Sequence, residues 1–289
     1  MAEILFVKNM PLGIFYFRRF SRIYPALILL CTILYLNSVI IGQRSIYINF
    51  PEYIYSVSLI ENYFSIYGHR TFALDHIWSL CIEEHMYLLL GGIAVLYRWK
   101  KLPIVTVTTI FALLFMANGA IQTWWAGLDY YAVYWRSDVR GASILISVTC
   151  FLLLRDRTTL SPLLRAEWLP VCLALCAFIL NIKLIPDPIK YSVGTTLLAA
   201  SLALLPQAPT WFLSMLESPV LIYMGIWSYS LYIVQQPFLA LNFGGGHIQG
   251  FLKLPIIFIC GLACFYFVER PARRFLNRER RSPSGIVAG

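Results

Sequence analysis

The sequence predicts an all-α, polytopic membrane protein, and three observations support this fold class. Hydrophobic residues make up 59% of the 289 residues and charged residues only 13%, whereas a soluble domain has roughly 25% charged residues. The mean hydropathy is +0.70. Apolar runs reach the roughly 20 residues that a helix needs to cross a bilayer, and basic residues stand at their ends. This placement of the net charge of +9 is typical of membrane helices and argues against nucleic acid as a partner.

The apolar runs predict about eight membrane-spanning helices within one membrane-embedded domain, residues 1–276. The expected spans are 23–42, 76–97, 102–118, 139–154, 168–184, 189–206, 219–241 and 250–268. A ninth stretch, 52–66, is shorter and contains Glu61 and Asn62, which favours a re-entrant or interfacial segment. The polar residues 277–289 are expected to form a disordered cytoplasmic tail.

The distribution of basic residues predicts the orientation. If 52–66 does not cross, sixteen Lys and Arg residues collect on one side of the membrane and seven on the other. Basic residues are enriched in cytoplasmic loops. We therefore expect both termini to lie in the cytoplasm, with the lipid bilayer as the surrounding partner.

The helix predicted over 76–97 carries acidic residues inside an apolar run. An intramembrane carboxylate is costly unless it is paired, and it marks a functional site by default. At helical spacing, His76, Ser79, Glu83 and Tyr87 share one face, whereas Glu84 lies off it. The first three of these residues are the candidate catalytic residues. The alternative is that the polar face lines a contact between helices and that arginines neutralise its carboxylates.

A basic motif, FYFRRFSRIYP, precedes the first predicted span. Arg18 and Arg22 stand at i,i+4 and Arg19 and Arg22 at i,i+3, so these side chains are neighbours on a helix. One interpretation is a positively charged anchor at the membrane surface. The other is a clamp for a phosphorylated cofactor, since guanidinium groups bind phosphate bidentately.

Two further segments combine polar side chains with predicted spans. Arg136 and Arg140 stand at i,i+4 at the start of one span, where such charges often only mark a helix end. Tyr229 and Gln235 belong to MGIWSYSLYIVQQPFL, which has more hydrogen-bonding capacity than lipid-facing positions tolerate. The motif FYFVERPARRF closes the last span and is interpreted as a helix stop with charged anchors.

The motifs FYxRRxxRIYP, WSLxxEExxYLL, SYSLYIxxxP and VERPxRRF follow one another over nearly the whole chain. In this order they resemble acyltransferase family 3, the integral-membrane O-acyltransferases that acetylate lipopolysaccharide O-antigens, capsular and exopolysaccharides, Nod factors and peptidoglycan. The resemblance implies transfer of an acyl group, usually acetyl from cytoplasmic acetyl-CoA, to a hydroxyl of a cell-surface or lipid-linked saccharide. It also implies a location in the bacterial inner membrane.

The family motifs match particular residues of this chain. The arginine motif matches Arg18, Arg19 and Arg22, which implies a role in binding the cofactor, and the SLxxE motif matches Ser79 and Glu83. No metal site is expected. The residues expected to contact the saccharide are Trp78, Tyr87, Arg136, Arg140, Tyr229 and Gln235.

The chain also departs from the family pattern. The family usually has ten spans, and the first two have no counterpart here. Those spans include an Arg that is followed, after ten intervening residues, by a His. Gln235 stands where many relatives have a His. Three explanations stay open: a misassigned start, a truncated and inactive protein, or a partner or second copy that supplies the helices. We therefore expect little or no activity from the isolated chain, and the alternative function is a non-catalytic membrane protein of the same fold that binds a lipid-linked glycan or a partner subunit.

Overall fold

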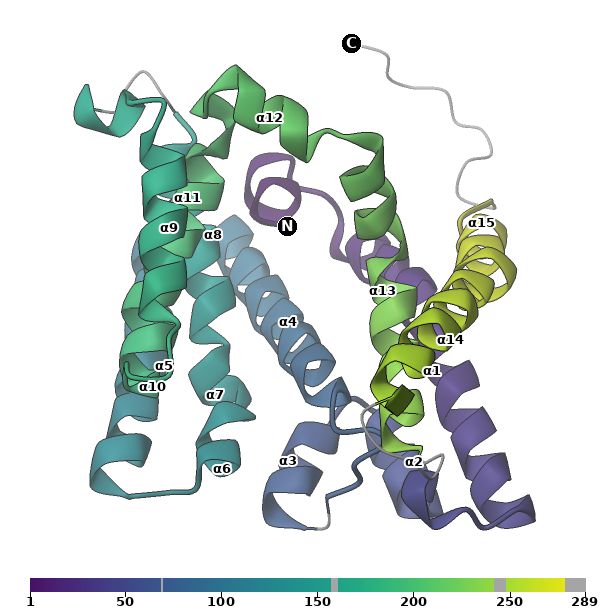
Figure 1. Ribbon diagram of the computed structural model, residues 1–289. Helices are drawn as coiled ribbons and strands as arrows, with labels where there is room; N and C mark the ends of the chain where they lie inside the picture. The colour runs from purple at the N-terminus through teal and green to yellow at the C-terminus, as the bar shows by residue number, and fades with distance from the viewer. Residues whose placement is uncertain (69, 157–160, 242–247, 279–289) are drawn as a thin grey trace. The chain divides into compact units, whose positions relative to one another are not determined.

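The protein is built of helices, as the computed structural model in Figure 1 shows. The structure describes residues 1–289 except 69, 157–160, 242–247 and 279–289, so most of the predicted tail lies outside the described residues. No strand occurs in the described part of the chain. The predicted all-α class is therefore confirmed.

Six of the predicted spans are confirmed as helices of sufficient length. In the described ranges, six helical stretches are long and apolar enough to cross a membrane. They run over Leu12–Ile40, Ile77–Lys100, Ile104–Trp125, Ser137–Leu154, Asp187–Gln207 and Lys253–Arg278. The protein is thus a multi-pass membrane protein.

The other two predicted spans are helices that fall short of this standard, for different reasons. The predicted span 168–184 corresponds to α9 (Leu169–Leu180), which has 12 residues. At the α-helical rise per residue this helix is only about 18 Å long. The helix α13 (Pro219–Ala240) has 22 residues, but its Ser, Tyr and Gln side chains lower its hydropathy. The expected number of about eight spans is thus six long apolar helices, one short apolar helix and one long helix with polar residues.

The stretch 52–66 does not form one continuous helix. It is divided between α2 (Phe50–Val57) and α3 (Glu61–Tyr67), and Leu59 between them has a positive φ of 57°. A capping box starts α2, because the Asn49 side chain accepts a hydrogen bond from the Glu52 amide and the Glu52 carboxylate accepts one from the Asn49 amide. Both helices are too short to cross a bilayer.

The chain divides into two compact units. Unit 1 comprises residues 1–9 and 78–222. In it, α8 packs against α5 and α11, and α11 packs against α9. Its helices are α4 from Trp78 onward (α4 is Ile77–Lys100), α5 (Ile104–Ala120), α6 (Tyr130–Tyr134), α7 (Ser137–Arg140), α8 (Ala142–Leu154), α9, α10 (Asp187–Ile189), α11 (Thr195–Leu204), α12 (Thr210–Leu216) and the first turn of α13.

The N-terminal π-helical turn of unit 1, Glu3–Val7, packs on the last turns of α4. The Arg98 guanidinium donates a hydrogen bond to the carbonyl oxygen of Leu5 at 3.2 Å, and the ring centroids of Phe6 and Tyr97 are 6.3 Å apart. Arg98 therefore has a partner within the protein as well as its expected place at the end of a span.

Unit 2 comprises residues 10–77 and 223–289. Its α1 (Leu12–Ile40) packs against α2 and α15. The helices α14 (Ile248–Cys264) and α15 (Arg270–Arg278) are joined by a π-helical turn, Phe265–Glu269, into one continuous rod. Where α14 meets α13, a Cβ atom on Gly261 would lie 2.5 Å from Leu231 Cδ2 and 3.1 Å from Leu231 Cα, so any larger residue would force the Leu231 side chain or the helix to shift. Without a hydrophobic driving force in lipid, such close packing is what holds helices together.

Candidate functional site

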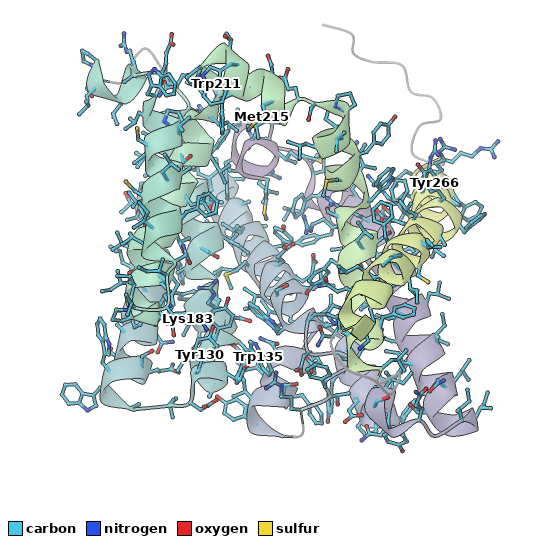
Figure 2. The ribbon with its side chains drawn as sticks, viewed as in Figure 1. Tyr130, Trp135, Lys183, Trp211, Met215 and Tyr266 are labelled. Atoms are coloured by element: carbon cyan, nitrogen blue, oxygen red, sulfur yellow. The ribbon has the colours of Figure 1, made fainter. Side chains whose placement is uncertain are left out.

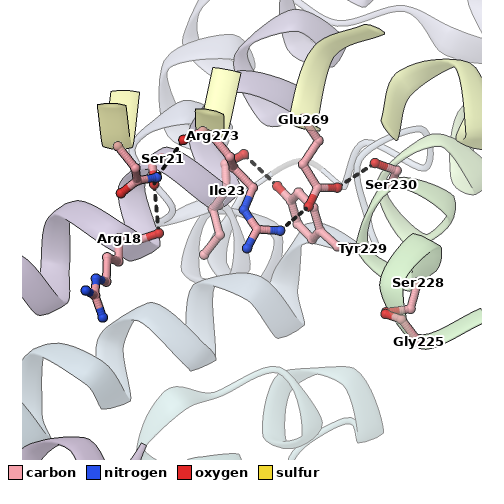
Figure 3. Close-up of polar contacts among 10 residues, drawn as sticks. Arg18, Ser21, Ile23, Gly225, Ser228, Tyr229, Ser230, Glu269 and Arg273 are labelled. Atoms are coloured by element: carbon pink, nitrogen blue, oxygen red, sulfur yellow. Dashed lines mark hydrogen bonds and ion pairs between the residues drawn. The ribbon is translucent and has the colours of Figure 1, made fainter. Parts of the chain in front are cut away.

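In unit 2, the basic motif of α1 is held by hydrogen bonds from α13 and α15. The hydroxyl of Ser21 is buried, donates to the carbonyl oxygen of Arg18 at 3.0 Å and accepts from the Asn277 side chain at 3.0 Å. The Tyr229 hydroxyl of α13 donates to the carbonyl oxygen of Ile23 at 2.6 Å. Figure 3 shows these contacts around α1. They fix the position of the segment that carries Arg18, Arg19 and Arg22.

Glu269 lies next to this segment and is almost completely buried, with 1% of its surface exposed. One carboxylate oxygen accepts a hydrogen bond from the Ser230 hydroxyl at 2.7 Å, and the other lies 3.4 Å from an Arg273 guanidinium nitrogen (Figure 3). A buried carboxylate needs such partners. Three motifs that are far apart in the sequence, RRFSRIY, SYSLY and VERPARRF, are therefore joined in one polar network.

Beside the network lies a cavity of about 930 Å³ that we call the basic cavity. Five arginines contribute to its lining, and the cavity is built entirely within unit 2. The lining residues are Ile14, Arg18, Phe265, Arg270, Arg273, Arg274, Asn277 and Arg278. Of the three arginines predicted to bind a cofactor, Arg18 lines this cavity and Arg19 and Arg22 do not.

His76 also belongs to unit 2 and lies in the turn that precedes α4 rather than on the helix. Its ring packs against Tyr232 with centroids 5.1 Å apart, and Nε2 is 3.0 Å from the carbonyl oxygen of Ile233. Burial lowers the pKa of His76 to about 4, against the opposing effect of that hydrogen bond. The imidazole is neutral at pH 7, so Nε2 carries the proton and donates the hydrogen bond to the carbonyl oxygen of Ile233. Nδ1 is then unprotonated, and it has no hydrogen-bond partner among the described residues.

A cluster of buried polar residues stands in the same part of unit 2, around α2 and α3. Glu61 is 2% exposed and accepts a hydrogen bond from Ser65. Burial raises the pKa of Glu61 to about 8, helped by the charges of Asp75 and Glu52 and opposed by Ser65 and Arg70. Arg70 pairs with Asp75 at 2.7 Å. The Glu61 carboxyl is therefore largely protonated in the folded protein at pH 7.

We expect this carboxyl to give the protein a distinctive pH dependence. The carboxyl titrates near 4.5 in the unfolded chain and near 8 in the folded one, so the folded state holds the extra proton between these values. The free energy of unfolding is therefore expected to fall by about 1 to 2 kcal/mol as pH rises from 6.5 to 8. Thermal unfolding of the detergent-solubilised protein measures this change.

Glu61→Gln is expected to remove most of the pH dependence of stability in this range, because the amide keeps the size of the carboxyl without titrating. The exposed Glu167 offers a matched control, and Glu167→Gln is expected to leave the dependence as it is. His76 makes stability rise with pH instead, because its imidazole binds the proton more tightly in the unfolded chain than in the folded protein. This effect is confined to the range between about pH 4 and pH 6.5. Equal pH dependence in the wild-type protein and Glu61→Gln would contradict the assignment to Glu61.

The polar face of α4 lies in unit 1. The Tyr87 hydroxyl donates to a Glu83 carboxylate oxygen at 3.3 Å, so these two residues share a face of the helix, as their spacing predicts. Glu83 is exposed in the described chain and Ser79 is half-buried. This face supplies an acceptor, Glu83, and a hydroxyl beside it.

The residues of unit 1 predicted to contact the saccharide fall into different environments. Trp78 packs on the Tyr134 ring at 5.0 Å, and the guanidinium carbon of Arg140 lies 4.5 Å from the same ring. Arg136 is instead paired with the Asp138 carboxylate through two hydrogen bonds, at 2.7 and 2.9 Å. Trp78 and Arg140 thus meet at one aromatic ring, and Arg136 is engaged in an ion pair.

The structure divides the candidate residues between the two units. The Tyr229 hydroxyl donates a hydrogen bond to the α1 backbone, so this residue helps to position α1. Gln235 is half-buried on α13. Unit 2 holds Arg18, Arg19, Arg22, His76, Tyr229 and Gln235, whereas unit 1 holds Trp78, Ser79, Glu83, Tyr87, Arg136 and Arg140. No group of three or more His, Cys, Asp or Glu side chains suited to a metal ion occurs in the part of the chain that the structure describes.

Sequence reasoning missed two groups. The α15 arginines were interpreted as charged anchors, although their spacing of three and four residues puts them on one helix face. The second group is His85 and Ser137, since His85 Nδ1 and the Ser137 hydroxyl are joined by a hydrogen bond of 2.7 Å. No local pattern predicts this contact, because 52 residues separate the two. Figure 2 labels Tyr130, the first residue of α6, and Trp135, which follows the last.

The chain is similar to two curated bacterial proteins. It is 25% identical over 305 aligned residues to Peptidoglycan O-acetyltransferase OatA of Listeria monocytogenes, an alignment that covers 93% of this chain and 48% of that protein. It is 23% identical over 295 residues to Putative peptidoglycan O-acetyltransferase YrhL of Bacillus subtilis, covering 92% of this chain and 46% of that protein. The chain spans about half the length of the curated relatives it matches. No family model and no solved structure matches it.

Proposed function

We propose that the protein is a membrane O-acetyltransferase of the acyltransferase family 3 type that acts on a cell-wall saccharide. The observation that carries the proposal is the convergence of three of the family-like motifs in one polar network beside the basic cavity. The similarity over more than nine-tenths of the chain to two proteins named as peptidoglycan O-acetyltransferases supports it. Those names favour a peptidoglycan hydroxyl over lipopolysaccharide as the acceptor.

The proposed reaction transfers an acetyl group from acetyl-CoA, or another acyl-CoA, to a sugar hydroxyl. The hydroxyl oxygen bonds to the thioester carbonyl carbon, the carbon–sulfur bond breaks, and the hydroxyl proton ends on the CoA sulfur. Glu83 is suited to orient the hydroxyl, and arginines are suited to stabilise negative charge on phosphate groups or on the carbonyl oxygen. The orientation proposed for this chemistry is an inner-membrane protein with both termini in the cytoplasm.

The test is made in the bacterium that encodes the protein, so that any partner or adjoining segment is present. Peptidoglycan is purified from the wild-type strain and from a strain in which the gene is deleted, and the acetate released by mild alkali is measured. We expect the deletion to lower ester-linked acetate on peptidoglycan and complementation to restore it. Unchanged acetate on peptidoglycan and on the other surface glycans would instead favour the non-catalytic alternative.

A further inference from the structure

The basic cavity collects positive charge from two helices of unit 2. Arg18 comes from α1, whereas Arg270, Arg273, Arg274 and Arg278 all come from α15. We propose that this cavity binds the phosphate groups of a phosphorylated ligand. The identity of the ligand rests on the proposed function: it is the nucleotide part of the acyl donor. The α15 arginines are the residues that hold it.

Among the described residues, one carboxylate, that of Glu269, offsets part of the positive charge of the basic cavity. Among the described residues that line the cavity there is no carboxylate. The buried Glu269 pairs with Arg273, and its other oxygen is occupied by Ser230. Within the described ranges, Arg18, Arg270, Arg274 and Arg278 form no ion pair with a carboxylate. An anionic ligand therefore meets guanidinium groups whose strongest natural partners are phosphate and carboxylate oxygens.

The spacing of these arginines favours a ligand with more than one phosphate group. The arginines at 270, 273, 274 and 278 stand at i, i+3, i+4 and i+8, which places them on a single helix face. From 270 to 278 the helix rises about 12 Å, which is longer than one phosphate group. Coenzyme A carries a diphosphate and a separate 3′-phosphate, so its charges are distributed over a comparable length.

The basic cavity is also preorganised. Asn277 lines it, and the Asn277 amide donates to the Ser21 hydroxyl of α1 at 3.0 Å and to the carbonyl oxygen of Arg273 at 2.7 Å. This contact holds α15 against α1, so that Arg18 and the α15 arginines face the same space. Preorganisation lowers the conformational cost of binding.

Binding of coenzyme A to the purified chain in nanodiscs of neutral phosphatidylcholine tests the proposal. Arg274→Gln and Arg278→Gln remove one charge each without removing a partner of Glu269. Each variant is expected to weaken binding about tenfold, which is typical of losing one charge-assisted contact at a partly exposed site. Dephospho-coenzyme A, which lacks the 3′-phosphate, should bind more weakly than coenzyme A and lose less affinity in at least one variant.

Arg155 provides the matched control, because it is an exposed arginine at the end of α8 that does not line the basic cavity. Arg155→Gln should bind coenzyme A as the wild-type protein does. A second arm measures retention of phosphatidylglycerol in mixed nanodiscs. If Arg274→Gln and Arg278→Gln alter only lipid retention, the phosphates belong to lipid headgroups and the donor assignment is overturned. Equal coenzyme A affinity in all variants also overturns it.

This binding experiment is independent of the acetylation measurement. If the deletion strain loses peptidoglycan acetate but the α15 variants bind coenzyme A normally, the proposed function stands and the cavity assignment falls. If binding depends on Arg274 and Arg278 but no glycan loses acetate, the cavity assignment stands and the transferase proposal falls.

Discussion

Glu83→Gln is expected to lower ester-linked acetate on peptidoglycan by about 100-fold or more, the usual scale for losing a positioned catalytic group. The substitution keeps the size of the side chain and removes the negative charge that orients an incoming hydroxyl. Glu83 is exposed on α4 and accepts a hydrogen bond from Tyr87 at 3.3 Å, so its carboxylate lies on the polar face of the helix beside a hydroxyl. The measurement is alkali-released acetate, normalised to the amount of protein in the membrane fraction.

The adjacent carboxylate is a matched control for the Glu83 experiment. Glu84 is the next residue on α4 and points about 100° away around the helix, so Glu84→Gln removes the same charge from a different face. It is expected to retain most of the activity. Glu83→Asp tests position, because it keeps the charge but shortens the side chain. Wild-type acetate levels in Glu83→Gln would show that the polar face has no part in transfer.

Glu269→Ala is expected to lower the free energy of unfolding by about 2 to 3 kcal/mol. It leaves the Ser230 hydroxyl without its acceptor in a buried site and also leaves a void. The contribution of Arg273 is expected to be smaller, since 47% of that side chain is exposed and solvent weakens the pair. Thermal unfolding of the detergent-solubilised protein measures the change.

Glu269→Gln separates the hydrogen bond from the charge. Glutamine still accepts from Ser230, so its expected cost is about 1 kcal/mol. Glu217 is an exposed carboxylate at the end of α12, and Glu217→Ala should be close to neutral. If Glu269→Ala is no less stable than the wild-type protein, the network does not hold α13 and α15 together.

Local sequence patterns predicted the helical class and one feature of the site. Apolar run length identified the long helices because a bilayer imposes a minimum length on any helix that crosses it. Helical spacing placed Glu83 and Tyr87 on one face, and their hydrogen bond confirms that placement. Both predictions depend only on residues within one helix.

Other features depend on contacts that helical spacing does not encode. The Asn277 amide reaches Ser21 across 256 residues of chain, and Tyr229 reaches Ile23 across 206. His76 was placed on the α4 face by extending the helical pattern by one residue. In the structure its ring turns to α13, because the preceding segment folds as a turn. Roles of the individual candidate residues in catalysis stay predictions.

The π-helical turn Phe265–Glu269 has a consequence for how this chain tolerates changes in length. Such a turn holds one residue more than the α-helical ladder requires. Removing a single residue such as Val268 would let the rod continue as an ordinary α-helix, with Glu269 and the residues after it still pointing as they do now. The same deletion inside α15 would turn every later arginine by about 100°. Homologues that differ by one residue here should therefore carry the gap before Glu269 and never after it.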